Sequence, residues 1–264
     1  MTSFPSLSQK LTFFSDQTPL AQTYLDFFSS HYEIFPLEEA DTIVVLGGDG
    51  YMLRVLHQLL AQKKSIPVYG INCGTVGFLM NTFSPHLNDL ALKLDKALPI
   101  HLHPLFMSAT TQEEALKTAY AINEVSLLRQ TSQSAKLSIF VDDILRLETL
   151  IGDGILLSTP AGSTAYNFSA GGPILPLQAN LLALTPINIF RPRRWHGALL
   201  PKSVRCRFDI LDSDKRPLKC TADFYEIPSC TSVTVHEDVT QSLTLLFDPD
   251  HNLEGRILEE QFRS

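Results

Sequence analysis

Two glycine-rich segments of this chain bring carboxylates, hydroxyls and adaptable backbone together. The first, Gly47-Gly48-Asp49-Gly50, follows the apolar run Thr42–Leu46, so it begins where a buried strand is expected to end. The second, Gly152–Pro176, opens on the apolar run Ile155–Leu157 and continues as STPAGSTAYN. In it, Gly162-Ser163-Thr164 favours the start of a short helix. The free N–H groups and positive dipole end of such a helix suit a phosphate or a nucleotide.

Asp49 is the carboxylate of the first segment and lies where a turn leads into a helix. Its glycine neighbours allow positive φ and a close approach of the backbone to a ligand. A carboxylate in this position can hydrogen-bond a sugar hydroxyl, and the alternative reading is an N-cap for the helix that follows. Arg54, one turn further along, suits either a phosphate partner or a solvated helix face.

The second half of the chain contains further polar residues whose positions suit ligand binding. Asn123-Glu124 lies inside an otherwise apolar strand, Ala119–Leu128. Neighbours in a regular strand face opposite sides, so both can serve one ligand only at a strand end or bulge; a simple turn is the alternative. Asp153 is confined between two glycines. Tyr166 offers a flat face for stacking on a base and a hydroxyl at its rim, unless it is a core residue.

In this order the motifs resemble those of the NAD kinase family, enzymes that phosphorylate the 2′-hydroxyl of the adenosine ribose of NAD. The resemblance covers most of the chain, through the GGDG turn, Ile71–Leu79, Asn123-Glu124 and Gly152–Pro176. GGDG alone also occurs in lipid kinases of the diacylglycerol and sphingosine type and in phosphofructokinases, whereas STPAGSTAYN is much more specific. Two rival hypotheses remain, a GGDG-type lipid kinase and a non-catalytic NAD or NADP sensor. The intact Asp49 counts against the sensor.

The resemblance implies a reaction and a set of residues for it. Asp49 would be the general base for the ribose 2′-hydroxyl, which attacks the γ-phosphate of ATP to give NADP, with Mg²⁺ on the ATP phosphates. NAD would lie in a cleft between domains. The implied NAD-binding residues are Asp49, Gly50, Phe78, Asn123, Glu124, Asp153, Ala161, Thr164, Ala165, Tyr166, Asn167, Phe168, Ser169 and Asn188. Further nucleotide or phosphate contacts are expected from Gly48, Arg54 and Asp223.

The chain departs from the family pattern at two positions. Ala161 stands where many relatives carry Ser, so one hydroxyl contact to the ligand is expected to be absent. Phe224 replaces the Gly that often follows the family counterpart of Asp223, so the turn there is expected to differ. The basic segment Arg191–Arg194 suits phosphates, acidic residues of another subunit, or solvent. The chain has neither a P-loop nor a GxGxxG fingerprint, which argues against a P-loop phosphate site and hydride transfer.

Composition narrows the class of protein further. A net charge of −7 argues against a nucleic-acid surface, and it requires that anionic substrates be held by local dipoles, a few cations and Mg²⁺. No apolar run is long enough to span a membrane, and the N-terminus lacks a signal-peptide pattern. The four cysteines show no metal-ligand spacing and read as reduced thiols. We therefore expect a cytoplasmic enzyme, and the resemblance implies a homodimer or homotetramer.

The elements that must position these residues change in character near residue 98. Before it, the expected strands Lys10–Phe14, Thr42–Leu46 and Ile66–Asn72 alternate with helices, which predicts an α/β domain with a mostly parallel sheet over residues 1–98. Residues 99–251 predict many short strands, up to Leu243–Phe247, and hence an all-β, sandwich-like domain. The resemblance implies that this domain binds NAD. The resemblance implies that residues 252–264 return to the first domain.

Overall fold

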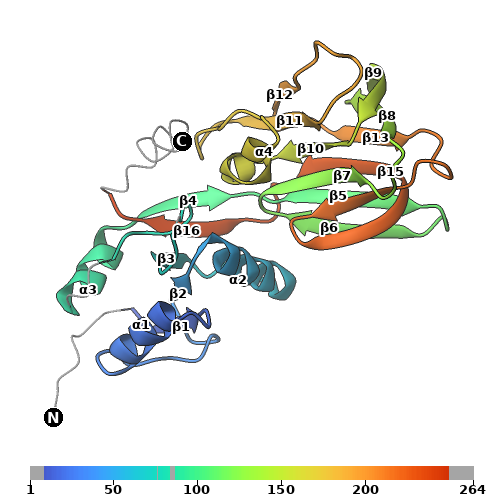
Figure 1. Ribbon diagram of the computed structural model, residues 1–264. Coiled ribbons are helices and arrows are strands. Elements are labelled where there is room, and N and C mark those ends of the chain that lie inside the picture. Colours follow the sequence, from blue (N-terminus) through green and yellow to red (C-terminus); the bar gives the residue numbers. More distant parts are fainter. Residues whose placement is uncertain (1–8, 76, 84–86, 250–264) are drawn as a thin grey trace. The chain divides into compact units, whose positions relative to one another are not determined.

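The computed structural model describes residues 9–75, 77–83 and 87–249. The described residues divide into two compact units, one up to Leu102 together with residues 242–249, and the other His103–Gln241. The chain leaves the first unit after Leu102, slightly later than the boundary near residue 98 that the sequence predicted. It returns at Ser242, and the expected returning segment 252–264 lies outside the described residues. The structure confirms the predicted fold class, a mostly parallel α/β part followed by a β-rich part (Figure 1).

The first unit contains a five-stranded sheet in the order β1-β2-β3-β16-β4. Four strands run parallel, and β4 pairs antiparallel with β16. The strands are β1 Leu11–Ser15, β2 Thr42–Gly47, β3 Val68–Asn72, β4 Leu98–Leu102 and β16 Leu243–Phe247. The helices are α1 Pro19–Ser29, α2 Asp49–Gln62 and α3 Leu87–Lys96.

The placement of β16 corrects one expectation. Its alternating burial fits any half-buried strand, and the sequence pattern placed it with the β-rich domain. In the structure it pairs with β3 and β4 of the first sheet instead. Strand periodicity reports burial and not the identity of the neighbouring strand, which is why the pattern could not assign the partner.

Local sequence explains where the first unit places its helix starts. β2 is buried along its whole length, as a central parallel strand requires. α1 begins at Pro19 after the N-cap Thr18, whose hydroxyl accepts a hydrogen bond from the Ala21 N–H at 3.4 Å. α2 begins at Asp49 directly after β2, and Gly48 is its N-cap. The sequence therefore puts Asp49 at the carboxyl end of a buried parallel strand, where α/β sheets bind ligands.

The second unit is built on an eleven-stranded sheet that is antiparallel at every pairing among its described strands. A large apolar cluster formed by buried residues of these strands lies in its core. The strands are β5 Leu105–Thr111, β6 Leu116–Ala121, β7 Glu124–Arg129, β8 Ala135–Val141, β9 Ile144–Gly152, β10 Gly154–Ser158, β11 Leu181–Ile187, β12 Ala198–Pro201, β13 Cys206–Ile210, β14 Leu218–Ala222 and β15 Tyr225–Glu237.

Two short helical turns follow β10, the 3₁₀ turn η1 Ala161–Thr164 and α4 Tyr166–Ser169. They lie where the sequence predicted the start of a short helix. Among the described residues, no helix has both the length and the apolar character needed to cross a membrane.

Candidate functional site

Asp49 uses its carboxylate to bind a neighbouring loop rather than its own helix. Oδ2 accepts a hydrogen bond from the Phe78 N–H at 2.9 Å, and Oδ1 accepts one from the Leu79 N–H at 2.9 Å. The N-cap of α2 is Gly48, which provides no side-chain cap. The geometry therefore does not support the alternative reading of Asp49 as an N-cap. The half-buried carboxylate is instead oriented by two fixed backbone donors.

The ends of β2 and β3 meet beside Asp49. The Cys73 N–H donates to the Gly47 carbonyl at 2.7 Å, and the Asn72 Oδ1 accepts from the Gly74 N–H at 3.0 Å. Three more predicted site residues lie in this unit. Phe78 is half-buried, whereas Gly50 and Arg54 are exposed to solvent. Arg54 thus lies on the solvated side of α2, and both interpretations of it stand.

In the second unit, the Asn123-Glu124 pair lies at a break between two strands. The single strand expected over Ala119–Leu128 is interrupted, because β6 ends at Ala121 and β7 begins at Glu124. The strand end was one of the two arrangements that would let both side chains serve one ligand. Backbone alternation therefore does not force Asn123 and Glu124 to opposite faces.

The carboxylate of Asp223 holds this break in place. Its Oδ2 accepts from the Ile122 N–H at 2.6 Å, and its Oδ1 accepts from the N–H groups of Asn123 at 2.9 Å and Glu124 at 3.1 Å. Asp223 itself adopts a φ of +52° directly after β14. The sequence presented Asp223 as a nucleotide contact, but here its carboxylate binds the backbone that presents Asn123 and Glu124.

Thr159 fastens the same break from the other side. Its N–H donates to the Asn123 carbonyl at 2.9 Å, and its Oγ1 donates to the Ile122 carbonyl at 2.7 Å and accepts from the Gly162 N–H at 3.1 Å. A Cβ at Gly162 would collide with the main chain of Asn123, so this position requires glycine. Thr159 was not identified from the sequence, where its hydroxyl looked like one of several in a turn.

Two polar atoms of the pair remain available. Asn123 Oδ1 and Glu124 Oε2 are buried and have no hydrogen-bond partner among the described residues. An unmade hydrogen bond of this kind costs about 1–3 kcal/mol, so such atoms mark a place that a ligand or water completes. Burial, and then the nearby Asp223 charge, raises the pKa of Glu124 to about 8. Burial raises the pKa of Tyr166 too, with further contributions from Glu124 and Asp153.

We predict that Glu124→Gln stabilises the protein at neutral and alkaline pH. The folded-state pKa of about 8 exceeds the ordinary value of 4.5, so folding retains a proton that the unfolded chain releases. Stability linked to this group is complete below pH 4.5 and is lost as the pH rises to about 8. Gln does not titrate, so the variant gains up to about 3 kcal/mol at neutral pH.

The measurement is the melting temperature of each protein from about pH 4 to 9. The difference between Glu124→Gln and the native chain should grow with pH and level off above about 8. Glu113→Gln, at an exposed turn of the same unit, is the control and should show no such trend. A pH-independent difference for Glu124→Gln would mean that Glu124 is already ionised in the folded protein.

The predicted NAD-binding loop after β10 contains both buried and accessible residues. Asn167 is fully buried: its Nδ2 donates to the carbonyls of Ser163 at 3.1 Å and Pro173 at 2.8 Å, and its Oδ1 accepts from Thr185 Oγ1 at 2.6 Å. Its side chain therefore holds the loop in shape and has no donor left for a ligand. Among the other loop residues, Ala161 is buried, the half-buried ones are Thr164, Ala165 and Tyr166, and the exposed ones are Phe168 and Ser169.

Asp153 belongs to a small polar cluster at the start of β10. Its Oδ1 accepts from Arg129 Nε at 2.6 Å and its Oδ2 accepts from Asn188 Nδ2 at 2.9 Å. The Asn188 hydrogen bond, with a smaller contribution from Arg129, lowers the pKa of Asp153. The structure thus brings together Asp153 and Asn188, which the sequence proposed separately. It adds Arg129, which the sequence did not single out because a lone Arg at a strand end carries no pattern.

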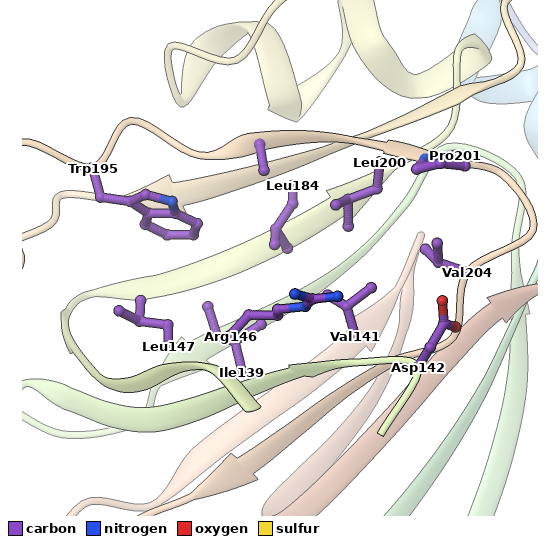
Figure 2. Close-up of a pocket in the computed structure, with 11 residues that line it drawn as sticks. Ile139, Val141, Asp142, Arg146, Leu147, Leu184, Trp195, Leu200, Pro201 and Val204 are labelled. Atoms are coloured by element: carbon purple, nitrogen blue, oxygen red, sulfur yellow. The ribbon is translucent and has the colours of Figure 1, made fainter. Parts of the chain in front are cut away.

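An apolar cavity lies elsewhere in the second unit. It has a volume of about 500 Å³ and is bounded by the β8–β9 hairpin, β11, β12 and Trp195 (Figure 2). None of the predicted NAD-binding residues lines it. In the basic segment before Trp195, the guanidinium groups of Arg191 and Arg193 lie over the Phe190 ring, at 5.6 and 5.5 Å from its centroid.

Comparison with known proteins identifies the family. Residues 7–97 match the ATP-NAD kinase N-terminal domain, and residues 122–194 match the ATP-NAD kinase C-terminal domain. The chain belongs to the NAD kinase family. It is 50% identical to the NAD kinase of Rhizorhabdus wittichii over 254 residues, which cover 96% of this chain and 98% of that one. It is 48% identical to the NAD kinase of Zymomonas mobilis with the same coverage.

Two solved structures of NAD kinases share the fold. Yeast NADH kinase, complexed with NADH, superposes with a TM-score of 0.80 at 23% identity, covering 97% of this chain and 88% of that one. The NAD kinase of Archaeoglobus fulgidus, in complex with ATP, gives a TM-score of 0.72 at 23% identity, covering 95% of this chain and 97% of that one. The family expected from the motifs is therefore confirmed.

Proposed function

We propose that this chain transfers the γ-phosphate of ATP to the 2′-hydroxyl of the adenosine ribose of NAD and so produces NADP. The observation that carries the proposal is family membership over nearly the whole chain, with relatives about 50% identical that are NAD kinases. The oriented carboxylate of Asp49 supports a catalytic protein over a sensor, because a sensor needs no base.

Asp49 acts as the general base. It accepts the proton of the 2′-hydroxyl as that oxygen forms a bond to the γ-phosphorus and the bond from phosphorus to the ADP oxygen breaks. The N–H groups of Phe78 and Leu79 orient the carboxylate, so fewer of its conformations are unproductive for the reaction. Fixed orientation of this kind supports a role in positioning as well as in proton transfer.

The second unit supplies the NAD-binding groups. Asn123 Oδ1 and Glu124 Oε2 are buried acceptors with no hydrogen-bond partner in the described part of the chain, and they suit the hydroxyls of a ribose. A protonated Glu124 can also donate one hydrogen bond. Asp153 with Asn188 and the ring of Tyr166 serve the remaining parts of the dinucleotide, the ring by stacking on a base.

Mg²⁺ bound to the phosphates of ATP would supply charge neutralisation as the phosphoryl group moves. The described residues contain no group of three or more His, Cys, Asp or Glu side chains arranged to hold a metal ion.

The protein is proposed to work in the cytoplasm as a homodimer or homotetramer. All four cysteines are buried and unpaired, which suits a reducing compartment. Two edge strands of the large sheet, β9 and β12, expose large apolar side chains: Ile144 and Leu145 on β9 and Leu199 on β12. Exposed apolar edges are typical of surfaces that pair with another chain. Sedimentation that gives a monomer at micromolar concentration would contradict the oligomer.

The activity is tested by incubating the protein with ATP and Mg²⁺ and, separately, with NAD, diacylglycerol or sphingosine. NADP formation with no lipid phosphorylation is expected. Lipid phosphorylation without NADP would support the lipid kinase. Tight binding of NAD without any NADP would support the sensor.

Replacing Tyr166 with Ala should weaken NAD binding by about 1–3 kcal/mol, by analogy with base stacking on aromatic side chains. The half-buried ring leaves the fold little dependent on it. Calorimetry of NAD binding measures the loss, and Tyr225→Ala, at an exposed tyrosine of the same unit, is the control. A large fall in melting temperature with unchanged NAD affinity would make Tyr166 a core residue.

A further inference from the structure

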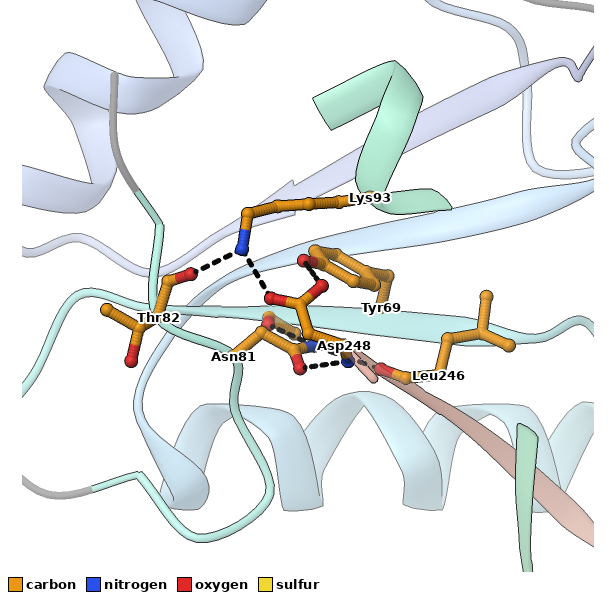
Figure 3. Close-up of polar contacts among 7 residues, drawn as sticks. Tyr69, Asn81, Thr82, Lys93, Leu246 and Asp248 are labelled. Atoms are coloured by element: carbon orange, nitrogen blue, oxygen red, sulfur yellow. Dashed lines mark hydrogen bonds and ion pairs between the residues drawn. The ribbon is translucent and has the colours of Figure 1, made fainter. Parts of the chain in front are cut away.

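A buried polar cluster lies in the first unit, close in sequence to the loop whose N–H groups bind Asp49. Figure 3 shows its side chains and their polar contacts. Asp248 follows β16 and is 6% exposed. Its Oδ1 accepts from the Tyr69 hydroxyl at 2.7 Å, and its Oδ2 forms an ion pair with Lys93 Nζ. Lys93 Nζ also donates to the Thr82 carbonyl at 3.1 Å. The cluster therefore joins α3, β3 and the end of β16 to the residue that follows Asn81.

Asn81 is the centre of this cluster and is fully buried. Its Nδ2 donates to the carbonyls of Gly70 at 3.1 Å and Leu246 at 2.9 Å, and its Oδ1 accepts from the Asp248 N–H at 2.9 Å. Its own N–H donates to the Gly70 carbonyl at 2.7 Å, and its carbonyl accepts from the Asn72 N–H at 2.9 Å. Main chain and side chain together fix Asn81 to β3 and to β16.

Only Met80 separates Asn81 from the amides that orient Asp49. Met80 is fully buried and cannot move freely. The short segment from Phe78 to Asn81 is thus fixed at one end by the Asp49 carboxylate and at the other by the Asn81 cluster. We expect a displacement of Asn81 to shift the Phe78 and Leu79 N–H groups, because only Met80 lies between Asn81 and Leu79.

Stability alone gives little reason for such a cluster. A buried ion pair loses hydration that its Coulomb attraction only partly replaces, and apolar residues of similar volume often serve the fold as well. A cluster that must hold one loop in one place does benefit from directed bonds, because they specify position as well as contact.

We infer that Lys93 and Asn81 are positioning residues for phosphoryl transfer. With Asp248 they fix the loop whose amides orient the Asp49 carboxylate. This inference rests on the proposed role of Asp49 as the general base. Neither residue touches a substrate in this account, so their effect is on the rate of the chemical step and not on NAD affinity.

The test compares Lys93→Met, Lys93→Arg, Asn81→Ala and the control Lys96→Met in the full chain. Lys96 lies one turn further along α3 and is exposed. Lys96→Met therefore makes the same chemical change as Lys93→Met, at an exposed position of the same helix. Lys93→Met and Asn81→Ala should lower kcat by about 10- to 100-fold, the scale of a small misplacement of a reacting group, with the KM for NAD little changed. Lys93→Arg should restore most of kcat, and Lys96→Met should leave it unchanged.

Combination with Asp49→Asn separates this inference from the proposed function. If Lys93 acts through the Asp49 carboxylate, Lys93→Met should cost little more once that carboxylate is gone. Losses of kcat that multiply in the double variant would overturn the inference, as would an equal loss of kcat in Lys96→Met.

Normal kcat in Lys93→Met and Asn81→Ala, with Asp49→Asn impaired, would overturn the inference and leave the proposed function standing. Near-normal kcat in Asp49→Asn would overturn the role of Asp49 and this inference with it. Lys93 is about one quarter exposed, so its variants test the idea even if Asn81→Ala fails to fold.

Discussion

Asp49→Asn should lower turnover by about 10²- to 10⁴-fold while NAD still binds. Asn keeps the size of the side chain but cannot accept the proton of the 2′-hydroxyl. It also has one acceptor oxygen where the carboxylate has two, so it can bind only one of the two N–H groups at Phe78 and Leu79 in the same way. Steady-state kinetics and calorimetry of NAD binding measure the two effects separately.

A second variant shows how much of this loss comes from the loop. Asn81→Ala loosens the same loop from its other end and keeps the Asp49 carboxylate. Its loss of turnover should be smaller than that of Asp49→Asn. Equal losses in the two variants would mean that loop position accounts for the whole effect. Near-normal turnover of Asp49→Asn would leave Asp49 a loop-binding residue without a catalytic role.

Asp223→Asn should weaken NAD binding by about 100-fold and lower stability by about 3 kcal/mol. The carboxylate accepts three backbone N–H groups at the break that presents Asn123 and Glu124. An Asn side chain places an NH₂ group against at least one of these donors. The break should then shift, and the two orphan acceptors of the pair should lose their common orientation.

The matched control for this variant is Asp212→Asn. Asp212 has a similar φ of +57°, and its side chain is half exposed in an ion pair with Lys136. Asp212→Asn therefore measures the stability lost by an Asp-to-Asn change at a positive φ where the side chain does not bind backbone N–H groups as Asp223 does. Calorimetry and thermal melting should show little change for this control. Unchanged NAD affinity in Asp223→Asn would mean that the conformation of the break does not matter for binding.

The sequence was most informative about which residues follow buried strands. The apolar run Thr42–Leu46 correctly placed Asp49 at the end of a parallel strand. A fully buried strand can be recognised from its own continuous apolar run, without knowledge of the strands beside it. The break after Ala121 was only one of the alternatives, since Asn-Glu within an apolar run fits a bulge, a strand end or a turn. β11 was not predicted as a strand, and it contains Pro186, a residue that strand patterns exclude.

The internal partners of polar groups could not be predicted. Asp223 and Asn167 carry the same side chains whether they face a ligand or bind the backbone, and only the fold shows that their polar atoms are used within the protein. Arg129 meets Asp153 across neighbouring strands, a pairing that depends on strand order. Asn81 and Asp248 lie far apart in the chain, and their contact requires β16 to return to the first sheet.

The most direct test of the proposed reaction compares NAD with an analogue that lacks only the 2′-hydroxyl of the adenosine ribose. Both are incubated with the protein, Mg²⁺ and ATP labelled in the γ-phosphate. We expect NAD to become labelled NADP, whereas the analogue should bind, compete with NAD and receive no label. Transfer of label to the analogue would rule out the proposed reaction, because the attacking group would then be another hydroxyl and Asp49 would have no proton to accept from the 2′ position.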